Sequence, residues 1–258
     1  MTSDIGWLWK EGYTGESWNF VTGCHKVSDG CCNCYAERIA LHYGWSKQPW
    51  TRQYAEANVT VREDRFDKPR RWKNPRMIFV NSMSDLFHYF VPDRVIARGF
   101  EVMTACPQHI FIILTKRPER AVEWHDWPAN VWMGTSVEDM RVALRIDTLR
   151  RCQAAIKFIS FEPLIGPVGR IDLTGYQWAI VGGESGPNFR PMNHAWARAI
   201  RDQCVQQRVP FFFKQSSGFK SGASPYLIEA DGSKTTWQQY PGDVVADPKD
   251  QPQQLTLF

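Results

Sequence analysis

The sequence predicts an α/β protein built as a complete or partial (β/α) barrel, and two observations carry this prediction. Apolar, β-branched or aromatic runs recur at fairly even intervals along the 258 residues, and most are nearly continuous, as strands buried on both faces tend to be. Amphipathic segments lie between these runs and indicate crossover helices that join parallel strands. About seven such units favour a barrel, with a doubly wound open sheet as the alternative.

The predicted strands follow from the apolar runs, taken in chain order. They cover residues 17–23, 76–82, 109–115, 130–136, 156–162, 177–183 and 209–215. Amphipathic patterns predict helices between them, for example over residues 35–44, 92–107 and 137–153.

The chain divides into three predicted parts. Residues 1–217 would form the barrel, with an insertion at 45–76 that is rich in basic and aromatic residues. Residues 218–241 would form a hairpin extension, because Asp231 and Gly232 supply a tight turn. The Pro- and Asp-rich segment 242–258 is typical of a flexible tail.

The composition favours a soluble protein of the cytoplasm. The chain is 43% hydrophobic and 22% charged, it has no run of about 18 apolar residues, and its first residues lack the layout of a signal peptide, so no membrane is expected. In a reducing compartment, seven cysteines indicate a metal or redox centre more than disulfides. The net charge of +4 permits a polyanionic partner.

Charged and hydroxyl residues follow nearly every predicted strand. Barrel enzymes place their chemistry at the carboxyl ends of the strands, and Glu138, Glu162, Glu184 and Lys214 each lie within a residue or two of a buried run. Together they would form a polar, charged pocket. The alternative is that they are ordinary polar loop residues.

Three cysteines have the spacing of a metal centre. Cys24, Cys31 and Cys34 follow the pattern C-x6-C-x2-C, after the first predicted strand and directly before a predicted helix. Three thiolates on one loop can bind three irons of a four-iron cluster and leave the fourth iron open for a small chelating ligand.

A structural zinc site is the alternative for these thiols, and it needs a fourth protein ligand. The candidates for that ligand are Cys32, His25 and His42. The other three cysteines stand alone in predicted helical segments and are expected to be small core residues; they are Cys106, Cys152 and Cys204.

Seven motifs carry a resemblance to a known family. They are WNFVTGCHKVSDGCCNCYAER, FVNSMSDLFH, ILTKRPER, VWMGTSVED, FISFEPLIGP, WAIVGGESGP and FFFKQ. In this order, from Trp18 to Tyr240, they resemble a three-cysteine family of phages and bacteria, long without an assigned function, that is grouped with the radical S-adenosylmethionine superfamily. The first cysteine gap is longer here than that superfamily's usual C-x3-C-x2-C.

The resemblance implies a barrel of the radical S-adenosylmethionine type and two cofactors. Cys24, Cys31 and Cys34 would ligate a [4Fe-4S] cluster, whose open iron would bind S-adenosylmethionine. Reduction by an external electron donor would then produce a 5′-deoxyadenosyl radical that abstracts a substrate hydrogen. A phage-encoded member would work in the host cytoplasm.

The resemblance also implies roles for residues after the other strands. Those expected to bind S-adenosylmethionine are Ser82, Ser84 and Asp85 at its methionine amino group, Ser136 and Glu138 at its ribose, and Gly182 and Gly183, where backbone could approach closely. Those left for substrate contacts or proton transfer are Lys116, Arg117, Glu162, Glu184 and Lys214. The alternative for the second set is mutual ion pairing around the barrel rim.

Two further segments suggest partners. In the insertion, basic residues alternate with Trp50, Tyr54, Phe66 and Trp72, which would suit phosphates and bases of DNA, unless these aromatics pack on the barrel. The last five residues, Q-L-T-L-F, resemble the peptide by which bacterial replication and repair proteins bind the sliding clamp. The clamp contacts would be Gln254, Leu255, Leu257 and Phe258, although these side chains could instead fold back onto the barrel.

The sequence therefore leads to one main hypothesis and two alternatives. The main hypothesis is a radical S-adenosylmethionine enzyme that rearranges or isomerises a nucleic-acid base, in particular a hypermodified pyrimidine of phage DNA. The nearest alternative is a lyase of the same chemistry that repairs a pyrimidine photoproduct. The other is a zinc-stabilised, nucleic-acid-associated binding protein without catalysis.

Overall fold

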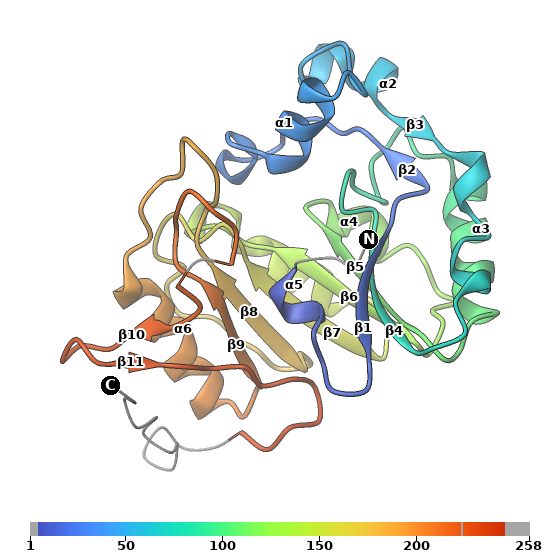
Figure 1. Cartoon of the computed structure of the whole chain (residues 1–258). Helices are drawn as coiled ribbons and strands as arrows, with labels where there is room; N and C mark the ends of the chain where they lie inside the picture. Colours follow the sequence, from blue (N-terminus) through green and yellow to red (C-terminus); the bar gives the residue numbers. More distant parts are fainter. Residues whose placement is uncertain (1–4, 223, 246–258) are drawn as a thin grey trace.

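The main sheet is a curled half-barrel of parallel strands (Figure 1). The computed structural model describes residues 5–222 and 224–245, and within them this sheet has seven strands in the order β1-β4-β5-β6-β7-β8-β9. The strands are β1 Thr14–Trp18, β4 Arg76–Val80, β5 Ile110–Thr115, β6 Val131–Ser136, β7 Ile156–Phe161, β8 Trp178–Gly182 and β9 Phe211–Gln215. All neighbours are parallel, and β1 and β9 are the two edges. This agrees with the predicted partial barrel.

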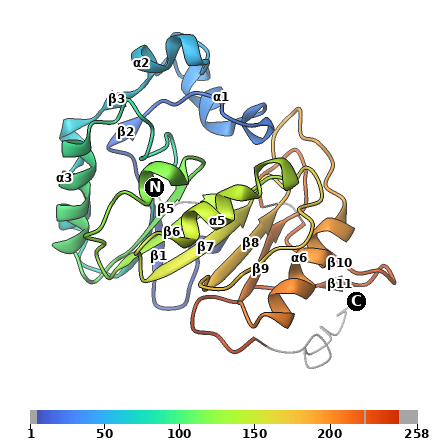
Figure 2. The ribbon, with the colours of Figure 1, turned by 180° about the vertical axis from the view of Figure 1, so that it is seen from behind.

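Helices cover the convex face of the sheet (Figure 2). They are α3 Asp93–Thr104, α4 Pro118–Ala121, α5 Leu144–Arg150 and α6 His194–Gln206. Successive strand residues point to opposite faces, so on β5 Phe111 joins the large core under these helices while Ile112 joins a second core on the concave face. Two buried faces explain why the strands read as continuous apolar runs.

A short 3₁₀ helix fills the amino end of the concave face. The helix η1, Gly6–Leu8, contacts β1, β4 and β9, so it bridges the two open edges of the half-barrel. Its Trp7 is buried and packs edge-on against Trp178 of β8, with ring centroids 6.2 Å apart. Phe158 and Phe212 complete this second core. Aromatic side chains therefore close the space where a full barrel would have another strand.

Six of the seven predicted strands agree with the structure to within two residues at each end, but the first prediction was wrong. The run 17–23 is split: β1 ends at Trp18, and β2, Val21–Thr22, pairs antiparallel with β3, Thr60–Val61, outside the main sheet. The chain leaves the sheet at Asn19, whose side-chain oxygen accepts from the backbone N–H of Met83 at 2.9 Å. Phe20 and Val21 are nevertheless buried, so the apolar run continues through the turn and the sequence gives no signal of the end of β1.

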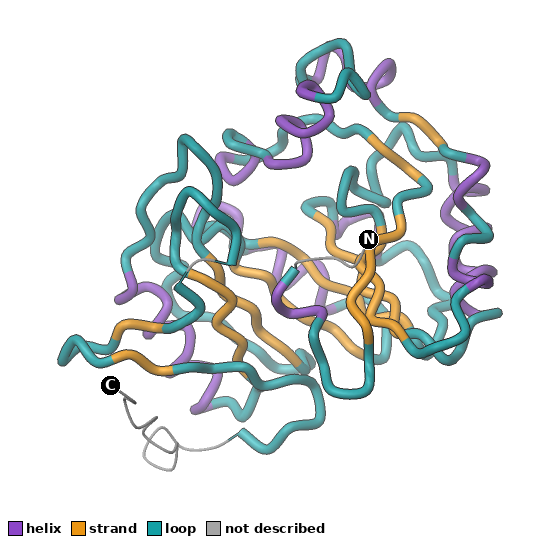
Figure 3. The backbone as a smooth tube through the Cα atoms, in the orientation of Figure 1, coloured by secondary structure: helices purple, strands orange, loops and turns teal. Residues whose placement is uncertain are grey.

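The predicted insertion arches over the carboxyl ends of the strands (Figure 1). Its elements, and the helix before it, are α1 Tyr35–His42, η3 Arg52–Tyr54, α2 Ala55–Asn58, η4 Glu63–Arg65 and η5 Pro69–Arg71. Figure 3 shows short helices joined by long loops here. Trp50 and Phe66 are buried, and Tyr54 and Trp72 are half-buried. For the two buried rings, packing on the protein replaces the expected stacking on bases.

The remaining predicted segments divide into a described and an undescribed part. The helix expected over 137–153 is shorter than predicted, with η6 at Met140–Val142 and then α5. The expected hairpin is present: β10, Leu227–Ile228, pairs antiparallel with β11, Lys234–Thr235. The sliding-clamp peptide at 254–258 lies outside the described residues. No helix in the described part is long and apolar enough to cross a membrane.

Candidate functional site

A cavity of about 900 Å³ lies at the carboxyl ends of the strands, beneath the insertion. Most of the residues singled out from the sequence line it. They are Cys24, Cys31, Cys34, Ser82, Ser84, Asp85, Lys116, Arg117, Ser136, Glu162, Gly183, Glu184 and Lys214. Glu138 and Gly182 do not line it. Because these residues follow the carboxyl ends of parallel strands, they lie around one cavity although they are up to about 190 residues apart in the chain.

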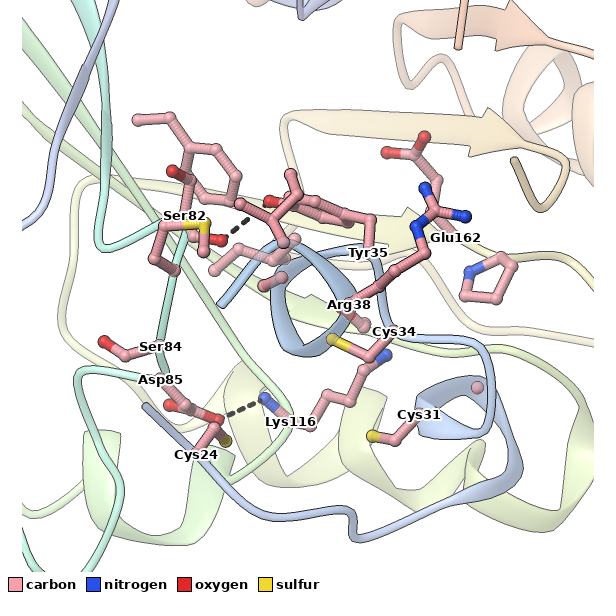
Figure 4. Close-up of a pocket in the computed structure, with 18 of the residues that line it drawn as sticks. Cys24, Cys31, Cys34, Tyr35, Arg38, Ser82, Ser84, Asp85, Lys116 and Glu162 are labelled. Carbon is pink, nitrogen blue, oxygen red and sulfur yellow. Dashed lines mark hydrogen bonds between the residues drawn. The ribbon is translucent and has the colours of Figure 1, made fainter. Parts of the chain in front are cut away.

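The cysteine loop, residues 24–34, connects β2 to α1 and points three thiols toward this cavity (Figure 4). Cys24, Cys31 and Cys34 are partly buried free thiols, whereas Cys32 is exposed and does not line the cavity. Burial raises the pKa of the Cys24 thiol to about 12, although the Arg117 guanidinium opposes this. Burial also raises the pKa of Cys34. A positively charged cofactor centre would be needed to keep such buried thiols deprotonated.

Three free thiols on one loop are the donor set that a four-iron cluster takes, whereas a single zinc ion needs a fourth ligand. Among residues 5–222 and 224–245, no three His, Cys, Asp or Glu side chains are close enough to bind one ion. In a cluster each thiolate binds a different iron, so its ligands lie further apart. The fourth zinc ligands considered are engaged or turned away: His25 Nδ1 lies 2.6 Å from His88 Nε2, and Cys32 and His42 are exposed.

Asp85 and Arg117 hold the start of the cysteine loop. The Arg117 guanidinium donates to Asp85 at 2.8 Å, to the Cys24 sulfur at 3.6 Å and to the His25 carbonyl at 3.1 Å. Asp85 also accepts from the Thr115 hydroxyl at 2.6 Å and from the Lys116 backbone at 3.1 Å. Burial alone would raise the pKa of Asp85, but Arg117 and these hydrogen bonds outweigh it and lower the pKa. Asp85 is thus an ionised support for the loop.

Glu138, which follows β6, holds the middle of the cysteine loop. It is 1% exposed and accepts from the Ser28 hydroxyl at 2.9 Å and from Arg145 at 3.1 Å, and it pairs with Lys116. Burial alone would raise the pKa of Glu138, but Lys116 and Arg145 lower it. A Cβ on Gly30 would collide with the Glu138 side chain, so only glycine lets the loop pass this close.

Glu184 holds the end of the loop in the same way. Its carboxylate accepts from the Asn33 amide at 3.0 Å and from the Arg190 guanidinium at 2.5 and 2.9 Å. Arg190 in turn donates to the Asp29 carbonyl at 3.0 Å. Burial would raise the pKa of Glu184, but these partners lower it. The loop is therefore fixed at its start, middle and end by residues that follow three different strands.

Glu162 and Lys214 form an ion pair in the cavity wall, with Nζ and Oε1 2.8 Å apart. Ser160 donates to the second Glu162 oxygen at 3.1 Å. The room beside Gly182 is taken by the Glu162 carboxylate, and the room beside Gly183 by the Ser217 backbone. Protein atoms thus lie against both glycines, and their predicted contacts with S-adenosylmethionine stay a prediction. Glu162 and Lys214 pair with each other, as the alternative for the second set expected.

The predicted serines also have partners within the chain. The Ser82 side chain bonds Asn19 at 3.2 Å, and the Ser84 hydroxyl donates to the Val21 carbonyl at 3.1 Å. The Ser136 carbonyl accepts from Arg145 at 3.0 Å. The hydroxyls of Ser82 and Ser84 fix the loop after β4 against the chain that leaves β1, and their predicted contacts with S-adenosylmethionine stay a prediction.

Two features were not predicted from the sequence: the buried contact between His25 and His88, and the position of Tyr35 in the cavity. His88 Nδ1 accepts from the Phe90 backbone at 3.2 Å, so its Nε2 carries the proton and donates to His25. Burial, followed by the charge of Arg117, lowers the pKa of His88 to about 3, so the donor stays neutral. Tyr35 lines the cavity and donates to the Ser82 carbonyl at 2.7 Å (Figure 4). The cysteine next to each was the only sequence signal for His25 and Tyr35, and His88 has no such neighbour.

The comparisons with known proteins return one finding. Residues 10–245 match a family described as "Protein of unknown function (DUF5131)". Neither the curated proteins nor the solved structures contain a match. The match covers the half-barrel, the cysteine loop, the insertion and the hairpin together, and the chain therefore belongs to the DUF5131 family.

Proposed function

We propose that this protein is a radical S-adenosylmethionine enzyme with a half-barrel of that type, in which Cys24, Cys31 and Cys34 bind a [4Fe-4S] cluster. One observation carries the proposal: three thiols of one loop face a single cavity at the carboxyl ends of a parallel sheet. The loop is fixed by ion pairs whose carboxylates are buried, in addition to the packing of Cys24 and Cys34 on Ala36, Ala40 and Trp50. Such external support suits a loop whose thiols are committed to a cofactor.

When bound and reduced by an external donor, the cluster and S-adenosylmethionine would supply a 5′-deoxyadenosyl radical for hydrogen abstraction. The residues of the chain would bind, orient and shield. Arg117 positions Cys24, Glu138 holds the middle of the loop and Glu184 holds its end. Glu162 and Lys214 present a fixed charge pair to the ligand. A volume near 900 Å³ is at the upper end for small-molecule sites, so it leaves room for a substrate beside the cofactor.

For the substrate we propose a nucleic-acid base, in particular a modified pyrimidine of DNA, because the cavity lining has more basic than acidic side chains. Abstracting hydrogen from an unactivated carbon of a base substituent is beyond ordinary acid and base groups, and a radical cofactor supplies that chemistry.

Iron binding tests the proposal directly. After anaerobic reconstitution, Cys24→Ala, Cys31→Ala and Cys34→Ala should each lose the bound iron and sulfide, because each removes a ligand. Cys106→Ala, in the outer core, and Cys32→Ala, beside the ligands, should keep both. An equal loss in Cys106→Ala would contradict the assignment, and about one retained zinc in place of iron would support the binding-protein alternative.

We also propose that residues 254–258 bind a bacterial sliding clamp. Deleting these five residues should weaken binding to the purified clamp, because Gln254, Leu255, Leu257 and Phe258 would supply the contacts. The iron content should stay the same. An unchanged affinity for the clamp would remove this part of the proposal.

A further inference from the structure

The cavity holds more fixed positive charge than its own acidic residues neutralise. Its lining within the described chain has seven basic and three acidic side chains. Each of the three carboxylates already has a cation: Asp85 pairs with Arg117 at 2.8 Å, Glu162 with Lys214 at 2.8 Å and Glu184 with Arg190 at 2.5 Å. Two further lining cations, Lys26 and Lys116, pair with Glu37 and Glu138 behind the wall.

Three lining arginines remain, and all come from α1 or the insertion. Arg38 belongs to α1, Arg62 follows β3, and Arg65 ends η4. None of the three forms an ion pair with a carboxylate of the described residues. Arg62 donates to the Thr22 hydroxyl at 3.2 Å and Arg65 to the Asn19 carbonyl at 3.3 Å, both neutral acceptors. Arg38 and Arg65 are exposed and Arg62 is half-buried.

The proposed cofactor does not account for this charge. S-adenosylmethionine has one carboxylate and two cationic groups, so it carries a net positive charge. A four-iron cluster with three thiolates adds one negative charge when oxidised and two when reduced, so the two cofactors together bring at most one net negative charge to three arginines. Guanidinium groups match phosphate oxygens in geometry and charge. The three arginines come from two segments over one cavity, α1 and the start and end of η4, an arrangement suited to several phosphates in succession.

Two exposed aromatic rings follow Arg38 in the chain, directly after α1. Tyr43 and Trp45 are 64% and 59% exposed and stack on each other, with centroids 5.3 Å apart and planes at 24°. Gly44 between them has φ 67°, a left-handed turn that glycine adopts without strain. Trp45 also lines the cavity. The stack therefore offers an aromatic surface to solvent at the cavity wall.

We infer that Arg38, Arg62, Arg65, Tyr43 and Trp45 form a binding site for single-stranded nucleic acid, which delivers one base to the cavity. This inference rests on the proposed function, whose substrate class it specifies. The arginines bind backbone phosphates, and the indole stacks on an unpaired base. Stacking requires a base whose face is free, which excludes bases inside a duplex. Successive phosphates on three arginines favour a strand over a free nucleotide.

The test is the fluorescence anisotropy of a labelled oligothymidylate of about 12 nucleotides, titrated with full-length protein at several salt concentrations. Arg38→Ala, and the double variant Arg62→Ala with Arg65→Ala, should each weaken binding several-fold and reduce the salt dependence, because phosphate contacts are lost. Trp45→Ala should weaken binding about tenfold with the salt dependence unchanged. Trp45→Phe should restore most of the affinity, which a misfolded protein could not do.

Matched controls lie away from the cavity. Arg151→Ala removes an exposed arginine that follows α5, and Trp9→Ala removes a half-exposed indole before β1; both should bind like the native protein. Equal losses in these controls would overturn the inference. So would equal affinity for a duplex, or thymidine monophosphate competing as well as the oligonucleotide. The titration can use protein without its cluster, so the two proposals are tested separately. Binding of the oligonucleotide by a protein that does not bind iron would overturn only the proposed function. Binding of iron by a protein that does not bind the oligonucleotide would overturn only this inference.

Discussion

The concave face of the sheet has an apolar end and a charged end. At the amino ends of the strands, Trp7, Phe158 and Trp178 are buried together. At the carboxyl ends, the same face presents Glu162 and Lys214 to a cavity. Along β7 the change takes four residues, since Phe158, Ser160 and Glu162 succeed one another on one face. On β9, likewise, Phe212 belongs to the aromatic core and Lys214 lines the cavity. These two strands thus contribute packing with an earlier inward residue and chemistry with a later one.

The two ends differ in what they contribute to stability. Burying aromatic side chains stabilises the fold in proportion to the apolar area removed from water. Buried ion pairs contribute little in net terms, because desolvation offsets their attraction, yet removing one partner is costly. The packing at the amino end therefore provides most of the free energy of folding. The ion pairs at the carboxyl end add little to it, and their role is to fix the cysteine loop.

The largest effect on stability is expected at the apolar end. Trp178→Ala should lower the free energy of unfolding by about 3–5 kcal/mol, because the buried indole packs on Trp7 and donates to the Gln239 carbonyl at 2.8 Å. Urea unfolding measures this loss. Iron bound per folded chain should not change, and Trp9→Ala should be near neutral. Loss of iron in a folded Trp178→Ala protein would contradict the view that the amino end acts on stability and the carboxyl end on cofactor binding.

A smaller loss of stability, but a loss of iron, is expected at the charged end. Glu138→Gln should cost about 3 kcal/mol, since it leaves Lys116 and Arg145 without their shared carboxylate and loosens Ser28. Iron release to a chelator should become faster although no cysteine is changed. Glu119→Gln, an exposed carboxylate on α4, is the control. Native release rates in Glu138→Gln would show that the loop does not depend on this support.

The smallest effect should come from Glu184, and it should depend on pH. Glu184→Gln removes the charge that binds Asn33 and Arg190, at a cost of about 1–3 kcal/mol at pH 7. The folded-state pKa of Glu184 is lowered, so its stabilisation is complete above the unfolded pKa of about 4.3 and is lost as the pH falls through the folded value. The difference between the unfolding curves of the two apoproteins should therefore be constant well above about pH 4.3 and should shrink as the pH falls below that value. A difference that grows as the pH falls would contradict an ionised Glu184.

The sequence predicted the elements whose signal is local. Apolar runs such as 109–115 and 156–162 become strands because both of their faces are buried. The C-x6-C-x2-C spacing likewise identified three thiols that share a cavity. The run 17–23 misled because Phe20 and Val21 are buried by the insertion rather than by the sheet. Periodicity reports burial, and it does not say which element provides it.

The partners of the charged residues could not be predicted. Glu138 and Glu184 were expected to face a ligand. Glu184 lines the cavity and Glu138 does not, and their carboxylates bind Ser28 and Asn33, more than 100 residues earlier in the chain. This pairing depends on the path of the cysteine loop, which no local pattern encodes. Arg145 and Arg190 carried no signal for the same reason. Strand-end position predicted where these side chains gather, and only the structure shows which of them remain open to the cavity.

The most direct test of the account is electron paramagnetic resonance of the anaerobically reconstituted, reduced protein, with and without S-adenosylmethionine. The account predicts the signal of a four-iron cluster that shifts when S-adenosylmethionine is added, because one iron has no protein ligand. A reconstituted protein that gives no such signal, or a signal that S-adenosylmethionine leaves unchanged, would contradict the assignment of Cys24, Cys31 and Cys34 to an open four-iron site.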